Sequence, residues 1–359
     1  MEPNGPFQDT PITAEAVSAP AAHGRPHSRR RANPIVILIV LALLAALGFS
    51  MLLNMALIGA ASASTAETLE EEFFSRDKFR EGTDKIAVIS VEGAILTKEG
   101  FVKDQIDQAR LDENVKAVVL RVDSPGGSVS ASDYFYHHLS KLRTESKKPI
   151  VVSMGSIAAS GGYYVAMAAG KTEKTIFAEP SCFTGSIGVM IPHYNVAGLF
   201  EEFGIEEDAI VSHRLKNMGS LGRQMTDEEK KIFQTLVDEG FARFKEIIRD
   251  NRTQFGEDPE ALDKIATGQV YTAQQAKENG LIDEIDFIEG AIDRAIELAG
   301  VDRDAVQVVR YKRIPTLSSL LLGAQAQSRG FDLQQLFDLS APKAYYMVTQ
   351  LPPLVRNRE

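Results

Sequence analysis

Short apolar runs alternate with longer polar segments through the middle of the chain, from about residue 84 to residue 312. The apolar runs are rich in Val and Ile and predict β-strands at 86–91, 117–122, 150–154, 175–178, 187–191 and 306–311. The intervening segments predict helices at 100–111, 129–142, 160–169, 196–203 and 286–298. Strands that alternate with helices in this way predict an α/β fold with crossover connections.

Two capping boxes mark further helix starts. Thr226 is followed three residues later by Glu229, and Thr272 by Gln275, a spacing that lets each pair satisfy the free N–H groups of a first turn. Gly280 is a typical residue to follow a helix end. The helix that opens at Thr226 carries an apolar stripe, which we interpret as a core face or a subunit contact.

A longer apolar stretch lies near the N-terminus. Residues 35–53 contain no charged side chain over 19 positions, and four arginines precede them within 25–31. A helix of this length is sufficient to cross a bilayer core, and arginines favour the cytoplasmic side. We therefore predict a single-pass transmembrane signal anchor over 34–60, with the bulk of the chain outside the cytoplasm. The alternative is a cleaved signal peptide, because residues 61–63 (Ala-Ser-Ala) fit a cleavage pattern.

The remaining segments complete the expected domain organisation. Residues 1–33 are rich in Pro, Ala and polar residues and predict a disordered cytoplasmic tail. Residues 61–83 are polar and acidic and predict a linker. One folded domain is expected over 84–312. Residues 313–359 are too short for a domain, so we expect them to be mobile or to contact another copy of the chain.

Composition excludes several classes of function. The formal net charge of −10 disfavours a nucleic-acid partner. The single cysteine, Cys182, excludes an intrachain disulfide and a cysteine-rich zinc site, and the six histidines show no metal-binding spacing. No glycine-rich nucleotide loop is present. We expect no metal and no cofactor.

The candidate for chemistry is Ser160, in the sequence GSIAASGGYY at 155–164. It follows an apolar run and precedes two glycines, which predicts a serine at a strand-to-helix turn. The N–H groups of a helix start can stabilise an oxyanion. A second glycine turn at 123–127 follows another strand, so the N–H of Gly126 or Gly127 could act together with that of Gly161. The alternative for both segments is a turn that serves packing alone.

A nucleophilic serine needs a base, and the sequence leaves this residue open. His193 and His213 are possible, and Lys216 is a third candidate because a lysine that is neutral can accept a proton. Lysines in loops are more commonly solvated surface charges. Ile157, Tyr163 and Met190 are candidates for lining a pocket.

Three motifs in order resemble the signal peptide peptidase A (SppA) family, in its small single-domain form. They are RVDSPGG at 121–127, SMGSIAASGGYY at 153–164 and TGSIGV at 184–189. The resemblance covers roughly residues 84–300. It implies the spiral of ββα units shared with Clp-type peptidases and crotonases, and a membrane-anchored serine endopeptidase with a Ser/Lys dyad.

The resemblance also implies a role for each matched residue. Ser160 is the nucleophile, Lys216 the base, Gly127 and Gly161 the oxyanion donors, and Ser186 the residue that orients the lysine. Expected substrates are cleaved signal peptides and other extended apolar peptides. The implied location is the bacterial cytoplasmic membrane, with the catalytic domain outside the cytoplasm and a homo-oligomer around the active sites.

Two other functions stay open at this point. A crotonase-type enzyme acting on acyl-CoA would share the fold and the glycine turns, although an extracytoplasmic domain would lack access to CoA. A non-catalytic membrane scaffold could also keep the same fold.

Overall fold

The computed structural model describes residues 34–63, 69–74, 82–314 and 345–347. The expected tail at 1–33 and most of the C-terminal tail lie outside these residues. The chain divides into two compact units, which cover Met1–Ala63 and Ser64–Glu359.

The described part of the first unit, residues 34–63, is one helix, α1 (Pro34–Ala63), of 30 residues. Its described large apolar side chains are exposed, for example Leu38 at 71% and Leu52 at 69%. Helix formation over the expected anchor segment is therefore confirmed. Among the residues that the structure describes, however, no helix is long and apolar enough to cross a membrane.

The second unit is a mixed α/β structure. Its strands are β1 (Leu69–Phe73), β2 (Lys85–Glu92), β3 (Val115–Ser124), β4 (Gly126–Ser128), β5 (Ile150–Ala159), β6 (Ile176–Ala178), β7 (Phe183–Gly185), β8 (Val270–Thr272), β9 (Glu284–Ile285), β10 (Gln307–Arg313) and β11 (Tyr345–Met347). Its α-helices are α2 (Phe101–Leu111), α3 (Val129–Glu145), α4 (Gly161–Ala166), α5 (Ala197–Glu202), α6 (Asp227–Asn251), α7 (Thr253–Glu257), α8 (Pro259–Ile265), α9 (Ala273–Glu278) and α10 (Ile288–Ala299). Two 3₁₀ helices, η1 (Met167–Ala169) and η2 (Arg214–Asn217), complete it.

The described strands form a nine-stranded sheet, and seven of them follow the order β1-β10-β2-β3-β5-β6-β9. Outside this order, β7 pairs with β5, and β8 pairs with β7. All neighbours from β10 to β9 are parallel, and β1 is an antiparallel edge strand on β10. Parallel neighbours need crossover connections, which the intervening helices supply. This parallel-rich arrangement is compatible with the expected spiral of ββα units.

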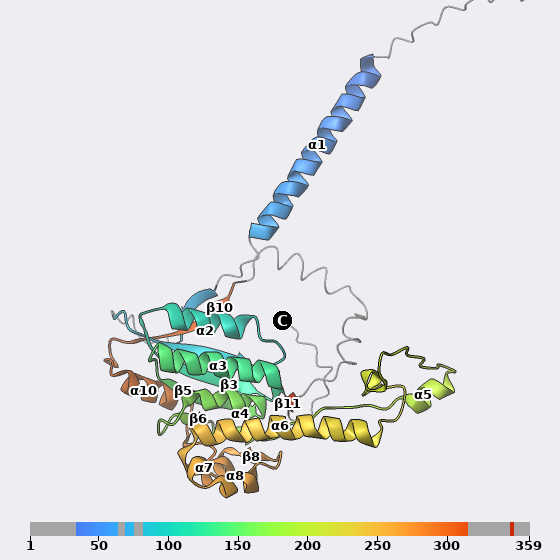
Figure 1. Cartoon of the computed structure of the whole chain (residues 1–359). Helices are drawn as coiled ribbons and strands as arrows, with labels where there is room; N and C mark the ends of the chain where they lie inside the picture. Colours follow the sequence, from blue (N-terminus) through green and yellow to red (C-terminus); the bar gives the residue numbers. More distant parts are fainter. Residues whose placement is uncertain (1–33, 64–68, 75–81, 315–344, 348–359) are drawn as a thin grey trace, which may run out of the picture. The chain divides into compact units, whose positions relative to one another are not determined.

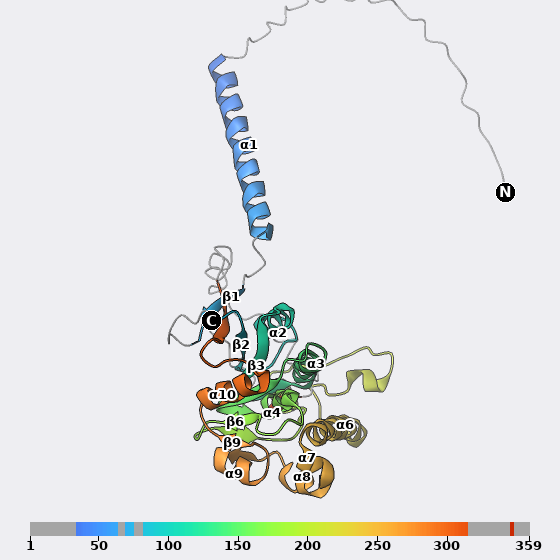
Figure 2. The same cartoon turned by 90° about the vertical axis from the view of Figure 1, so that its left-hand side faces the viewer.

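Both faces of the sheet are covered, and alternation along the strands decides which side chain meets which layer (Figures 1 and 2). Along β2, Ala87 and Ile89 face the large core beneath α2, α3 and α4, whereas Ile86 and Val88 face the smaller core beneath α10. Burial on both faces explains why the strands read as continuous apolar runs. Residues near the ends of β3 and β5, such as Val122 and Ala158, are part of the large core.

The strand β5 changes its partner along its length. Residues 152–154 pair with β6, and residues 157–159 pair with β7 instead. The register of β3 and β5 also shifts between Val122 and Ser124, and Ala158 still pairs with Ser124. The last residues of β5 are therefore held between β3 and β7, and Ser160 follows directly after them.

Most elements expected from the sequence are confirmed, and the two capping boxes are both formed. The expectation of a strand at 187–191 is wrong, because the strand lies earlier, at β7, where it pairs with β5 and β8. The segment at 61–83, expected as a linker, contains β1, whose acidic residues face basic partners across β10. One of these pairs is Arg310 with Glu72.

Residues 192–225 form an arm that carries α5 and η2 (Figure 1). The arm is attached to the start of α6 through Arg223, which donates hydrogen bonds to the Glu229 carboxylate and to the Asn217 carbonyl oxygen. Glu229 is also the N3 residue of the capping box that opens α6. The Arg223–Glu229 pair therefore joins the arm, including η2, to the start of α6.

We expect Glu229→Gln to loosen this junction. The hydrogen bond from Arg223 lowers the pKa of Glu229 from 4.5 to about 2, which corresponds to about 3 kcal/mol of stabilisation for a carboxylate that is almost fully buried. A lowered pKa in the folded state stabilises the fold above pH 4.5, and the contribution is lost as the pH falls from about 4.5 towards 2. Urea unfolding should show a loss of about 1–3 kcal/mol at pH 7 for Glu229→Gln, and a smaller loss at pH 3. An equal loss at both pH values would contradict this account.

Candidate active site

Ser160 stands at the turn between β5 and α4, as the sequence predicts. Its backbone has φ 55° and ψ −113°, a conformation that non-glycine residues rarely adopt. Its N–H donates to the Gly185 carbonyl oxygen at 2.8 Å, and its carbonyl oxygen accepts the first helical bond of α4 from Tyr164. The turn is therefore fixed on both sides, and its strain is typical of a functional residue.

The hydroxyl of Ser160 is buried and has no hydrogen-bond partner among the described residues. The residue as a whole is 1% exposed. A buried hydroxyl without a partner is costly, and proteins normally avoid it outside functional sites. This hydroxyl is therefore available to a substrate or to a base from elsewhere.

The two glycine turns meet beside Ser160. A methyl group placed on Gly161 would lie 3.1 Å from the Gly127 nitrogen and 2.5 Å from the Ser132 hydroxyl oxygen. A methyl group on Gly127 would overlap the Ile95 carbonyl oxygen, at 2.0 Å. Both positions therefore require glycine, and the N–H of Gly127 lies next to the residue that follows the serine.

Ser186 lies on the neighbouring strand end. The last residue pair between β5 and β7 is Ala159 with Gly185, so Ser160 and Ser186 are each one residue beyond it. Ser186 is buried, has φ 51°, and donates its N–H to the Gln269 carbonyl oxygen at 2.7 Å. The structure thus brings together Ser160, Ser186, Gly127 and Gly161.

Lys216 is the one predicted site residue that the structure does not bring to this cluster. It lies on η2 in the arm, it is exposed, and its backbone N–H donates to the His213 carbonyl oxygen. Figure 1 shows the arm beyond the start of α6, away from β5 and α4. No described interaction joins Lys216 to Ser160 within the chain.

The two alternative bases are engaged in the arm as well. The His193 ring contacts the Ser220 carbonyl oxygen at 3.3 Å, and the His213 ring accepts the Leu215 N–H that starts η2. Neither ring bonds Ser160. Of the three candidate pocket residues, Tyr163 is instead a core residue whose hydroxyl donates to the Leu281 carbonyl oxygen, while Ile157 and Met190 are half-buried.

Asp123 is a site residue that sequence reasoning missed. Its carboxylate accepts hydrogen bonds from the Ile157 N–H at 3.1 Å and the Ser156 hydroxyl at 3.3 Å. It therefore stabilises the end of β5, the segment that leads into Ser160. Its position in the motif at 121–127 was visible, but nothing in the sequence showed that a carboxylate there reaches across to the next strand.

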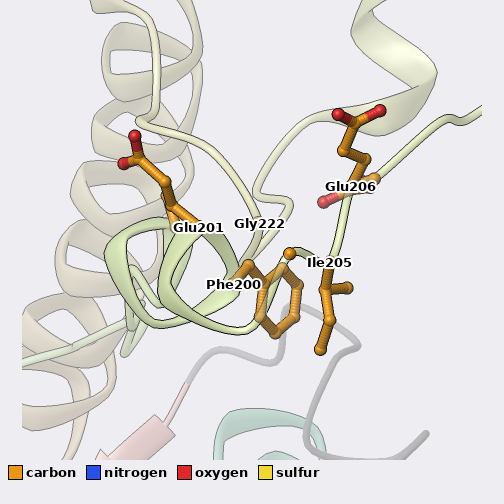
Figure 3. Close-up of a pocket in the computed structure, with 8 residues that line it drawn as sticks. Phe200, Glu201, Ile205, Glu206 and Gly222 are labelled. Atoms are coloured by element: carbon orange, nitrogen blue, oxygen red, sulfur yellow. The ribbon is translucent and has the colours of Figure 1, made fainter.

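A separate hollow of about 460 Å³ lies on the arm (Figure 3). Its lining includes Phe200, Ile205, Glu201 and Glu206, and none of the predicted site residues. Within the described residues, no group of His, Cys, Asp and Glu is arranged to hold a metal ion. Burial raises the pKa of the Cys182 thiol to about 12, as expected of a core cysteine.

We expect Gly161→Ala to lower peptide hydrolysis by about 100-fold, because the new methyl group crowds the Gly127 N–H from which oxyanion stabilisation is expected. The matched control is Gly240→Ala on α6, since a methyl group there makes only ordinary contacts, at 3.5 Å from the Val189 side chain. Steady-state kinetics on both variants would test this. Equal activity of the two would contradict the placement of the oxyanion site.

Known proteins support the resemblance. Residues 143–302 match the model of peptidase family S49. The chain is 36% identical to Protease 4 of Salmonella typhi over 251 residues. This match covers 68% of this chain and 39% of that protein. A protein of Enterococcus faecium provisionally named signal peptide peptidase SppA is 32% identical, over 64% of this chain and 65% of its own length.

A protein of Synechocystis sp. that is provisionally named a protease is 35% identical, over 68% of this chain and 84% of its own length. The chain therefore belongs to peptidase family S49, the family of signal peptide peptidase SppA. It spans less than two thirds of the length of the Salmonella and Enterococcus relatives.

Proposed function

We propose that the chain is a serine endopeptidase in which Ser160 attacks the peptide carbonyl. The observation that carries this proposal is the Ser160 turn itself: a strained backbone holds a buried, unpaired hydroxyl beside two glycine N–H groups. Family membership supports peptide hydrolysis as the reaction. The geometry therefore has the parts that acyl transfer needs, apart from a base.

The reaction follows from these parts. A neutral lysine amine takes the proton from Ser160, and the alkoxide adds to the substrate carbonyl carbon. The N–H groups of Gly127 and Gly161 stabilise the oxyanion that forms. The protonated lysine then gives its proton to the leaving amine. Water attacks the acyl-enzyme and releases the second product.

We assign the base to Lys216 from a second copy of the chain. Within one chain Lys216 is exposed on the arm and does not meet Ser160. The same arm exposes large apolar side chains, namely Leu199, Phe203, Ile205 and Ile210. Exposed apolar groups of this kind are typical of a surface that another protein covers. A homo-oligomer would cover the arm of one copy and place its Lys216 beside Ser160 of another.

We also propose that residues 34–60 anchor the chain in the bacterial cytoplasmic membrane, with the catalytic domain outside the cytoplasm. This rests on the sequence: residues 35–53 carry no charge and follow four arginines. An anchored peptidase would meet apolar peptides that stay in the membrane. Cleaved signal peptides are therefore the substrate class we propose.

To test the function, the full-length chain in detergent would be incubated with each of two substrates. An extended apolar peptide of about 20 residues should be cut at internal peptide bonds, which mass spectrometry of the products would show. An acyl-CoA thioester should be left intact. Thioester turnover without peptide cleavage would favour the crotonase-type reaction, and turnover of neither substrate would favour a scaffold.

A further inference from the structure

The register between β3 and β5 is interrupted shortly before the predicted nucleophile. Val122 of β3 pairs with Met154, and the next pair along the two strands is Ser124 with Ala158. One residue of β3, Asp123, therefore lies opposite three residues of β5. Such an insertion is a β-bulge, which bends the strand that carries it and leaves some of its backbone groups without a partner on the neighbouring strand.

The Asp123 side chain supplies hydrogen bonds to this bulge. Its carboxylate accepts the Ile157 N–H at 3.1 Å and the Ser156 hydroxyl at 3.3 Å. A methyl group placed on Gly155 would lie only 3.0 Å from a carboxylate oxygen, so all three bulge residues lie close to this side chain. The backbone of Asp123 is itself held, because its carbonyl oxygen accepts the Gly93 N–H at 2.9 Å. The carboxylate therefore contacts the bulge from a fixed position on β3.

The length of the bulge decides which side chain reaches the active-site turn. Beyond the bulge, Ala159 pairs with Gly185, and the Ser160 N–H donates to the Gly185 carbonyl oxygen at 2.8 Å. A slip of one residue along a strand moves every following side chain to the opposite face. The serine hydroxyl would then leave the neighbourhood of Gly127 and Gly161. Bulges near active sites commonly direct a side chain in this way.

The two edges of this segment are held unequally. On the β7 side, three residue pairs hold residues 157–159, and the Thr184 hydroxyl donates to the Ala158 carbonyl oxygen at 2.6 Å. On the β3 side, one described residue pair, Ser124 with Ala158, follows the bulge. The hydrogen bonds of Asp123 add to this single pair. Loss of the Asp123 carboxylate should therefore loosen the turn without unfolding the strand.

We propose that Asp123 is a positioning residue for Ser160, because its carboxylate accepts the hydrogen bonds of the bulge and so fixes the register of the turn. The effect on hydrolysis rests on the proposed peptidase function, whereas the effect on the bulge does not. Both donors, the Ile157 N–H and the Ser156 hydroxyl, are neutral. The role therefore needs an acceptor oxygen at this position and no negative charge.

The first test measures the bulge without any need for hydrolysis. Hydrogen exchange at the Ile157 amide would be compared in the full-length chain, in Asp123→Ala and in Asp123→Asn. Alanine removes the acceptor, and the asparagine side chain keeps a carbonyl oxygen that can accept the Ile157 N–H. We expect exchange to be about tenfold faster in Asp123→Ala and to change less than about twofold in Asp123→Asn. Unchanged exchange in Asp123→Ala would overturn the proposal.

The second test separates the chemical step from substrate binding. Hydrolysis of an apolar peptide by Asp123→Ala should show a kcat about 100-fold lower, the effect of a misplacement of about 1 Å, with a KM within about threefold of the wild type. Labelling by a serine-reactive phosphonate should slow by a similar factor. Asp123→Asn should restore both rates to within about threefold. Equal losses in the two variants would overturn the proposal, because the charge would then be what matters.

Asp258→Ala is the matched control for a purely structural effect. The Asp258 carboxylate also accepts one backbone N–H, from Ala261 at 3.2 Å, but at the start of α8. This variant should unfold at a lower urea concentration and keep kcat within about twofold. A similar fall in kcat would show that activity follows stability, and would overturn the positioning role. In a chain that cleaves no peptide, faster exchange at Ile157 in Asp123→Ala alone would support the held bulge and reject the peptidase function instead.

Discussion

Replacing Ser160 by alanine will lower peptide hydrolysis by about 10⁴-fold or more, because the acyl-enzyme can no longer form. The substitution removes one oxygen atom that has no described hydrogen-bond partner. It should therefore leave the fold intact, and relief of an unpaired buried hydroxyl could raise the stability slightly. Steady-state hydrolysis of a fluorogenic apolar peptide, with circular dichroism on the same samples, checks both statements.

Ser156→Ala is the matched control for this variant. Ser156 lies four residues earlier on the same strand end, is exposed, and its hydroxyl donates to the Asp123 carboxylate at 3.3 Å. We expect it to keep most of the activity and to keep labelling by a serine-reactive phosphonate, which Ser160→Ala should lose. Labelling that persists in Ser160→Ala would show that another serine reacts.

Replacing Lys216 by alanine will lower hydrolysis by about 10³-fold or more, although no described contact joins it to Ser160 within the chain. Lys216→Arg should not restore activity, because a guanidinium does not give up its proton in proteins. Lys231→Ala, an exposed lysine on α6, is the control. Loss in the Lys231 variant as well would indicate a general charge effect rather than a base.

The local part of the account could be predicted from the sequence. The strands of the parallel sheet read as apolar runs because both faces are buried, and the capping boxes at Thr226 and Thr272 are local patterns. The Ser160 turn was visible for the same reason, since its strand, its serine and its glycines are consecutive. A serine followed by two glycines at a strand-to-helix turn already indicates a nucleophile beside free N–H groups.

The parts that depend on distant contacts could not be predicted. Asp123 on β3 accepts a hydrogen bond from Ile157 on the neighbouring strand β5, which leads into the Ser160 turn. Tyr346 pairs with Gly127, although more than 200 positions separate them in the sequence. Strand β1 was expected as linker because its side chains are acidic, yet it pairs along the edge of β10. Lys216 could be named as a base, but its separation from Ser160 appears only in the folded chain.

The most direct test of the shared site is a mixture of two inactive variants. Ser160→Ala chains keep Lys216, and Lys216→Ala chains keep Ser160. If each site takes its serine from one copy and its lysine from another, co-expression of the two should restore activity to about one quarter of the wild-type value, as random pairing of equal subunits predicts. A co-expressed mixture that stays as inactive as either parent would contradict a site completed by a second copy.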